Sequence, residues 1–204
     1  SEAILPDGSE TSFMFADVRH KLHACCHGAH AMIEGLRNLV AAHDITAQNL
    51  AALSIRVNPR WLKVCDIKAP RTGLEVKFSY VFLAAMVLHH IDTAAYQSYD
   101  DSICGNAGLI ATASKITVIG DEAISDGAVN VSADTQTGVR HTTDFDLMDP
   151  IDLSVLGPRL VAKASVLIGP ARAEKIWESM DDLDSMPAAQ MACLLYTSDA
   201  ADEE

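Results

Sequence analysis

The sequence has little positive charge and no long apolar run, and each shortage excludes a class of protein. Its 204 residues include 15 Lys and Arg against 28 Asp and Glu, which gives a net charge of −13. A nucleic-acid-binding surface needs a surplus of cations to contact phosphates, so we expect no nucleic-acid partner. The longest apolar run, from Phe78 to Leu88, is too short to span a bilayer, so we expect no membrane partner.

The sequence also lacks the paired cysteine spacing of a disulfide framework. Its five cysteines, an odd number, lie irregularly at positions 25, 26, 65, 104 and 193. A chain of this length can build a hydrophobic core without disulfides, so we expect reduced thiols and a cytoplasmic protein.

The last residues have an unusual composition. Residues 193–203 read CLLYTSDAADE, which can be encoded by a DNA string that resembles the adapter of transposase-based sequencing libraries. We therefore expect residues 193–204 to be a tail that takes no part in the fold. The first residues, SEAILPDGSE, contain no initiator Met, and we interpret them as internal to a longer protein.

Hydrophobic periodicity predicts several helices. Apolar residues at helical spacing predict an amphipathic helix over 31–42, and the nearly continuous apolar run 77–90 predicts a buried helix. Two further helices are predicted over 156–167 and 173–180, with Gly169-Pro170 as the stop between them.

Alternating patterns predict strands. They lie at 53–57, 116–118 and 128–134, and the turn signal at 135–138 predicts that 139–145 returns as a hairpin partner. A loop is predicted between residues 64 and 73. Because strands do not alternate regularly with helices, the predicted class is α+β, with helices packed on an antiparallel sheet.

Four stretches together carry a resemblance to a known family. They are KLHACCHGAHAMIEGL at 21–36, PRTGLEVKFSYVFLAA at 70–85, SKITVIGDE at 114–122 with the hairpin at 128–145, and LVAKASVLIGPARAEKIWESMDDLDSM at 160–186. In this order they resemble the C-terminal part of the MmgE/PrpD family, which includes 2-methylcitrate dehydratase and cis-aconitate decarboxylase.

The resemblance implies an architecture. Family members combine a large all-helical domain with a smaller α+β lid and work as homodimers. It implies that residues 1–20 lead in from the helical domain, 21–146 form the lid, 147–192 form helices that return to the helical domain, and 193–204 are the tail. Most of the helical domain would then be missing, and we expect the chain alone to be inactive.

The resemblance also implies a chemistry. Family members dehydrate, decarboxylate or isomerise small di- and tricarboxylates without a metal or other cofactor, through proton transfer next to a carboxylate. Lys21 and Cys26 occupy the positions of catalytic residues, and His30, Lys77 and Ser79 those of substrate-binding residues.

Two departures bear on the reaction. Cys26 stands where the decarboxylase branch carries a His, and Phe82 where that branch carries a Tyr. Both put decarboxylation in doubt. The chain also departs from the methylcitrate dehydratase branch, which carries a Phe-Pro-Ala type string where this chain has His-Ala-Cys-Cys-His, so the subfamily is not fixed. We expect dehydration similar to that of 2-methylcitrate dehydratase, with an isomerase, epimerase or decarboxylase of the same family as the alternative.

Simpler interpretations stand beside these. Without the resemblance, Lys21 is a solvated surface lysine, Cys26 a small buried hydrophobe and His30 a hydrogen-bonded structural residue. The residue types of Cys25, Cys26, His27 and His30 suit zinc, although adjacent cysteines chelate one ion poorly. A non-catalytic α+β module that binds a small molecule or a protein is the remaining alternative.

Overall fold

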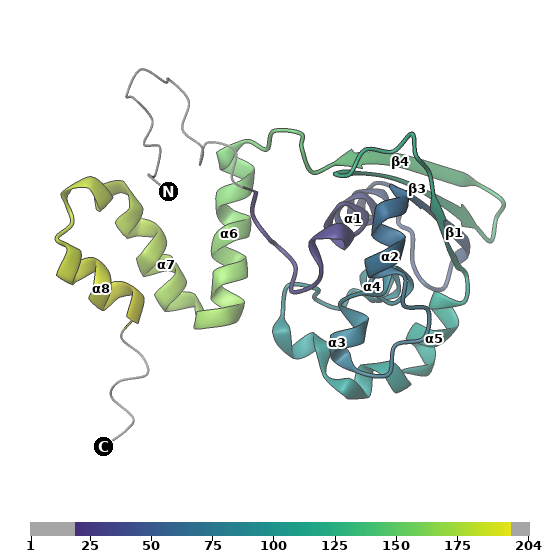
Figure 1. Ribbon diagram of the computed structural model, residues 1–204, viewed down its shortest axis with the longest axis horizontal. Helices are drawn as coiled ribbons and strands as arrows, with labels where there is room; N and C mark the ends of the chain where they lie inside the picture. Colours follow the sequence, from purple (N-terminus) through teal and green to yellow (C-terminus); the bar gives the residue numbers. More distant parts are fainter. Residues whose placement is uncertain (1–18, 197–204) are drawn as a thin grey trace, which may run out of the picture.

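The computed structural model describes residues 19–196 and has an α+β fold (Figure 1). The predicted class is therefore confirmed. Most of the leading segment, residues 1–18, and the end of the predicted tail, residues 197–204, lie outside the described residues. No helix in the described part of the chain is long and apolar enough to cross a membrane.

A four-stranded sheet forms one layer of the fold, in the order β2-β1-β3-β4. The strands are β1 (Leu50–Val57), β2 (Ile116–Gly120), β3 (Ala128–Thr135) and β4 (Arg140–Asp146). All four were predicted, including the hairpin of β3 with β4, which pair antiparallel.

The prediction of an antiparallel sheet was wrong in one respect. Strand β1 pairs with β3 antiparallel but with β2 parallel, so the sheet is mixed. Parallel neighbours need a long crossover. The segment between β1 and β2 provides this crossover. It contains the buried helix at 80–88 and the short helices at 62–65, 73–76 and 107–113.

Helix α1 (His30–His43) covers the sheet over β3 and β4. Its apolar side chains Met32, Ile33, Leu36 and Leu39 are buried, as the predicted amphipathic pattern requires. Gly35 faces the sheet, where an added Cβ would lie 3.1 Å from Val129 and 3.2 Å from Phe145. Glycine thus lets this helix approach the strands closely.

Helix α4 (Tyr80–Leu88) packs beside α1 and β2, and every one of its residues is buried. This confirms the predicted buried helix. Ser79 caps its N-terminus, accepting a hydrogen bond from the Phe82 backbone N–H at 3.3 Å.

Short helices fill the rest of the segment between β1 and β2, including part of the predicted loop at 64–73. They are α2 (Leu62–Cys65), α3 (Gly73–Val76) and α5 (Ala107–Ala113), with 3-10 turns that include η4 (Tyr96–Tyr99) and η5 (Asp101–Gly105). Their length explains why periodicity did not reveal them, since one or two turns give no repeating apolar face.

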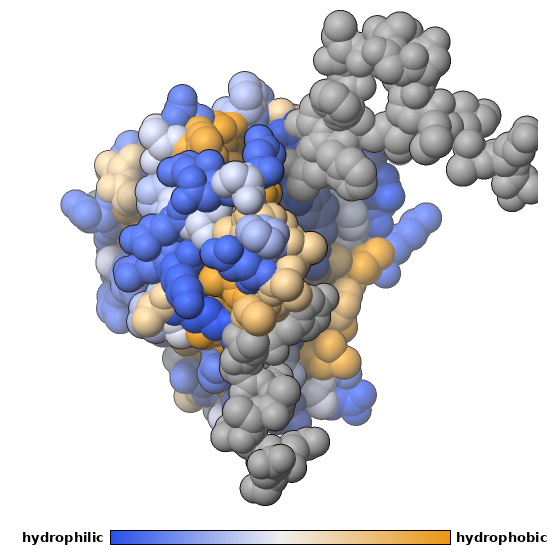
Figure 2. All heavy atoms as spheres, turned by 90° about the vertical axis from the view of Figure 1, so that its left-hand side faces the viewer, coloured by the Kyte–Doolittle hydropathy of each residue, from blue (hydrophilic) through white to orange (hydrophobic). Residues whose placement is uncertain are grey.

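Three helices follow the sheet: α6 (Leu153–Ile168), α7 (Pro170–Glu178) and α8 (Ala188–Tyr196). Gly169 has φ 84°, a left-handed conformation that favours glycine, and it ends α6 as predicted. Figure 2 views the molecule from the side of these helices and shows apolar side chains among polar ones. Exposed apolar residues between positions 153 and 196 include Leu167, Trp177, Met180 and Leu195.

Candidate functional site

The loop that precedes α1 brings the predicted site residues to one region. Backbone hydrogen bonds fix it at two points: the Ala24 N–H donates to the Thr93 carbonyl at 2.9 Å and the Cys26 N–H to the Lys77 carbonyl at 3.0 Å. The 3-10 turn η2 (His27–Ala29) then leads directly into α1. The loop therefore passes beside Lys77, just before the buried helix, and Lys21 lies three residues before the first of these anchored positions.

Three lysines from different segments form what we term the lysine cluster: Lys21 from the loop, Lys77 before α4, and Lys163 from α6. Burial lowers the pKa of Lys163, and the positive charges of Lys21 and Lys77 lower it further, against the opposing effects of Asp92 and Cys25. Lys163 therefore lies within electrostatic range of both Lys21 and Lys77. Such a cluster favours an anionic ligand.

A backbone carbonyl and two tyrosine rings hold two of the lysines in the cluster. The Lys163 ammonium donates to the Ala94 carbonyl at 2.6 Å. The Lys77 ammonium lies 4.3 Å from the ring centre of Tyr96 and 5.0 Å from that of Tyr99. These cation–π contacts hold Lys77 without neutralising its charge. Lys21 is exposed, so its ammonium remains accessible.

Cys25 is the buried thiol beside the cluster. Burial raises the pKa of Cys25 to about 12, although the charges of Lys21 and Lys163 and a hydrogen bond with Tyr99 act in the opposite direction. The group is therefore a protonated thiol at neutral pH, unsuited to act as a base or nucleophile.

A buried polar network connects the loop to α1 and α6. Nε2 of His23 lies 2.8 Å from Oε1 of Glu34, and its Nδ1 lies 2.8 Å from the Thr93 hydroxyl. The Arg159 guanidinium donates to the same Glu34 oxygen at 2.6 Å. Burial alone would raise the pKa of Glu34, but the hydrogen bonds from His23 and Arg159 outweigh it and lower the pKa to about 2. Glu34 is therefore ionised and ties α6 to the loop.

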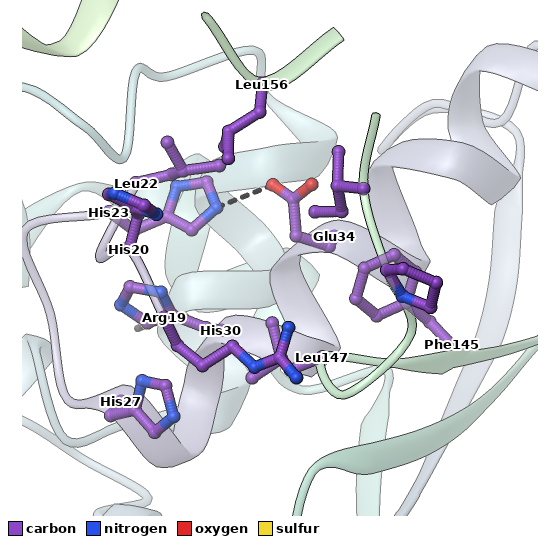
Figure 3. A pocket seen from close by; sticks show the side chains of 12 residues that line it. Arg19, His20, Leu22, His23, His27, His30, Glu34, Phe145, Leu147 and Leu156 are labelled. Atoms are coloured by element: carbon purple, nitrogen blue, oxygen red, sulfur yellow. Dashed lines mark hydrogen bonds and ion pairs between the residues drawn. The ribbon is translucent and has the colours of Figure 1, made fainter. Parts of the chain in front are cut away.

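A cavity of about 250 Å³ lies beside this network (Figure 3). We term it the histidine cavity, after the imidazoles that line it: His20, His23, His27 and His30. His30 is 2% exposed, and its Nε2 has no hydrogen-bond partner. Burial lowers the pKa of His30 to about 3, with further lowering by His23, His27 and Lys21. The predicted site residue His30 is thus a neutral imidazole with a free acceptor.

The remaining two predicted site residues have neighbours that give them structural roles. Cys26 is half-buried, and its thiol is hydrogen-bonded to that of Cys65 in the core. Ser79 is fully buried, and its hydroxyl donates to the Ile67 carbonyl at 2.5 Å while capping α4. The hydroxyl of Ser79 is therefore occupied, and nothing in its surroundings supports the predicted substrate contact.

The sequence analysis did not identify four residues of the candidate site: Arg159, Lys163, Tyr96 and Tyr99. Lys163 and Arg159 lie four residues apart on one helix, a spacing that places them on one face. That spacing was visible in the sequence, but nothing showed that this face would turn toward Lys21.

The zinc alternative finds no support in the geometry. Among residues 19–196, no group of three or more His, Cys, Asp or Glu side chains is arranged to hold a metal ion.

One comparison with known proteins gives a match. The family model of the MmgE/PrpD C-terminal domain matches residues 23–148, more than half of the chain. This span contains the sheet, α1, α4 and Lys77, and it ends before α6. A search of curated proteins gives no match.

Proposed function

The chain belongs to the MmgE/PrpD family, and from this membership we propose that it carries the carboxylate-binding part of a dehydratase acting on a small di- or tricarboxylate. The observation that carries the proposal is the lysine cluster. It gathers Lys21, Lys77 and Lys163 in a chain whose net charge is −13.

The cations extend beyond the cluster. A neighbouring cavity of about 170 Å³ is lined by Lys163 together with Arg37, Arg159 and Asp92. Arg159 is already paired with Glu34, and Asp92 supplies one negative charge. A ligand with two or three carboxylates would offset the remaining positive charge, whereas a neutral ligand would leave the lysines repelling one another.

The cluster suits proton removal next to a carboxylate. Loss of water from such an acid removes a proton from one carbon and a hydroxide from its neighbour, and negative charge develops on the carboxylate side. Fixed ammonium groups stabilise that charge. Because Cys25 is protonated, we propose that the base comes from the helical domain implied by the family resemblance, and that the 204-residue chain alone does not turn over substrate.

Two residues favour dehydration over decarboxylation. Cys26, where the resembled decarboxylase branch carries a His, is hydrogen-bonded to Cys65. Phe82, where that branch carries a Tyr, is buried and has no hydroxyl. Neither position thus carries the His or the Tyr that the resembled decarboxylase branch has there.

Calorimetric titration of the 204-residue protein with 2-methylcitrate and citrate tests the proposal. We expect saturable binding that weakens roughly fivefold in Lys21→Ala and in Lys163→Ala, since each substitution removes one ion pair worth about 1 kcal/mol. Lys63→Ala is the matched control, because Lys63 is an exposed lysine on α2. Equal affinity in all four proteins would refute the proposal, as would the absence of binding.

A further inference from the structure

Tyr99 connects the loop that carries Lys21 to Lys77, and it uses a different part of its side chain for each. Its hydroxyl donates to the Thr93 carbonyl at 2.9 Å, and the same carbonyl accepts the Ala24 N–H of the loop at 2.9 Å. The centre of its ring lies 5.0 Å from the Lys77 ammonium. One buried side chain thus joins the anchor of the loop to Lys77.

The residues on either side of Ala24 strengthen the connection between Tyr99 and the loop. Cys25 is 5% exposed, and its thiol is hydrogen-bonded to the Tyr99 hydroxyl. His23 lies 2.8 Å from the Thr93 hydroxyl through its Nδ1. Three consecutive residues of the loop, from 23 to 25, therefore contact either Tyr99 or the residue to which its hydroxyl donates.

The backbone of Tyr99 is held in place independently of these contacts. Gly73, the first residue of α3, lies so close that a Cβ on it would overlap the Tyr99 carbonyl oxygen. The Gly73 N–H donates to a side-chain oxygen of Asp101, two residues after Tyr99, at 2.7 Å. The segment from η4 to η5 is therefore fixed on α3. A residue that orients other groups needs such a rigid support.

From these contacts we infer that Tyr99 is a positioning residue of the carboxylate-binding site. Its hydroxyl holds the loop that carries Lys21 and its ring holds the Lys77 ammonium, so both are arranged before a ligand binds. The inference rests on the proposed function. A ligand with several carboxylates needs this arrangement because it contacts more than one lysine, whereas a monocarboxylate needs only one.

Tyr80 offers a matched comparison for the loss of the hydroxyl. It is also buried, and its hydroxyl also donates to a backbone carbonyl, that of Gly28, at 2.8 Å. Its ring has no cation–π contact with any lysine in the described range 19–196. Tyr99→Phe and Tyr80→Phe should therefore lower the melting temperature to a similar extent, and only Tyr99→Phe should disturb the lysines.

NMR titration of the 204-residue protein with citrate and with acetate tests the inference. The ratio of the citrate to the acetate association constant should fall at least about threefold in Tyr99→Phe and stay unchanged in Tyr80→Phe. A merely structural role would weaken both ligands alike and leave this ratio unchanged. In the ligand-free proteins, hydrogen exchange of the Ala24 amide should become faster in Tyr99→Phe but not in Tyr80→Phe.

The ring contact has a test on the unaltered protein, which decides the question even if Tyr99→Phe fails to fold. The rings of Tyr96 and Tyr99 should shift the ε-proton resonances of Lys77 upfield. Ordinary lysine shifts there would overturn the inference. Tyr99→Leu, which removes the ring as well as the hydroxyl, should move these resonances downfield, whereas Tyr99→Phe should not.

Two further results would overturn the inference: an unchanged citrate-to-acetate ratio in folded Tyr99→Phe, or an equal fall of that ratio in Tyr80→Phe. The same titrations separate this inference from the proposed function. Absence of citrate binding to the unaltered protein would refute the proposed function, and this inference with it. Citrate binding that weakens in Lys21→Ala, together with an unchanged ratio in Tyr99→Phe, would refute this inference alone.

Discussion

Replacing Glu34 by Gln removes the charge at the centre of the buried network that ties the loop to α6. Glu34 is 7% exposed, and its pKa is lowered to about 2 from an ordinary 4.5 by His23 and Arg159, against the effect of burial. That difference corresponds to about 3 kcal/mol of folding free energy at neutral pH. We therefore expect Glu34→Gln to lower the free energy of unfolding by about 3 kcal/mol at pH 7.

The stabilisation by ionised Glu34 should decrease as the pH falls. A carboxyl group with a lowered pKa stabilises the folded state fully above its unfolded value of 4.5, and the contribution is lost as pH falls toward 2. Urea unfolding followed by tryptophan fluorescence should show the two proteins converging across this range. The exposed Glu122 supplies the control Glu122→Gln, expected to change stability by less than about 0.5 kcal/mol. A difference below about 1 kcal/mol at pH 7, or one unchanged at pH 3, would refute the reasoning.

Three further predictions concern packing, capping and thiol chemistry. Gly35→Val should destabilise the protein by about 1–3 kcal/mol, because a Cβ at this position meets Val129 and Phe145. Calorimetry should show this as a lower melting temperature. An unchanged melting temperature would show that α1 can move away from the sheet. Ser79→Ala should destabilise the protein by about 1–2 kcal/mol in urea unfolding yet leave citrate affinity unchanged, and a loss of affinity would instead support the substrate contact. Iodoacetamide at pH 8 should label the exposed Cys193 at least about tenfold faster than Cys25 by peptide mass spectrometry, because burial raises the pKa of Cys25; equal rates would contradict that burial.

Much of the fold follows from local patterns. The helix over α1, the buried run of α4 and the hairpin of β3 with β4 each show their periodicity in a short window of sequence. The parallel pairing of β1 with β2 does not, because residues 53 and 116 meet only after a long crossover has folded. Local alternation is the same in parallel and antiparallel strands, so the mixed sheet was beyond prediction.

The site shows the same division. The resemblance indicated Lys21, Lys77 and His30, and both Lys21 and Lys77 lie within electrostatic range of Lys163. The sequence could not identify Lys163 as a site residue, because only tertiary packing places α6 beside the loop. Ser79 also has a local role that the sequence already offered, because a serine just before a buried helix serves as its N-cap.

The most direct test of the lysine cluster is the pKa of the Lys163 ammonium, measured by NMR of carbon-labelled lysines with and without citrate. Without citrate, burial and the charges of Lys21 and Lys77 should hold this pKa below its ordinary value of 10.5. Bound citrate favours the charged form and should raise it. An ordinary pKa for Lys163 that citrate leaves unchanged would contradict the account.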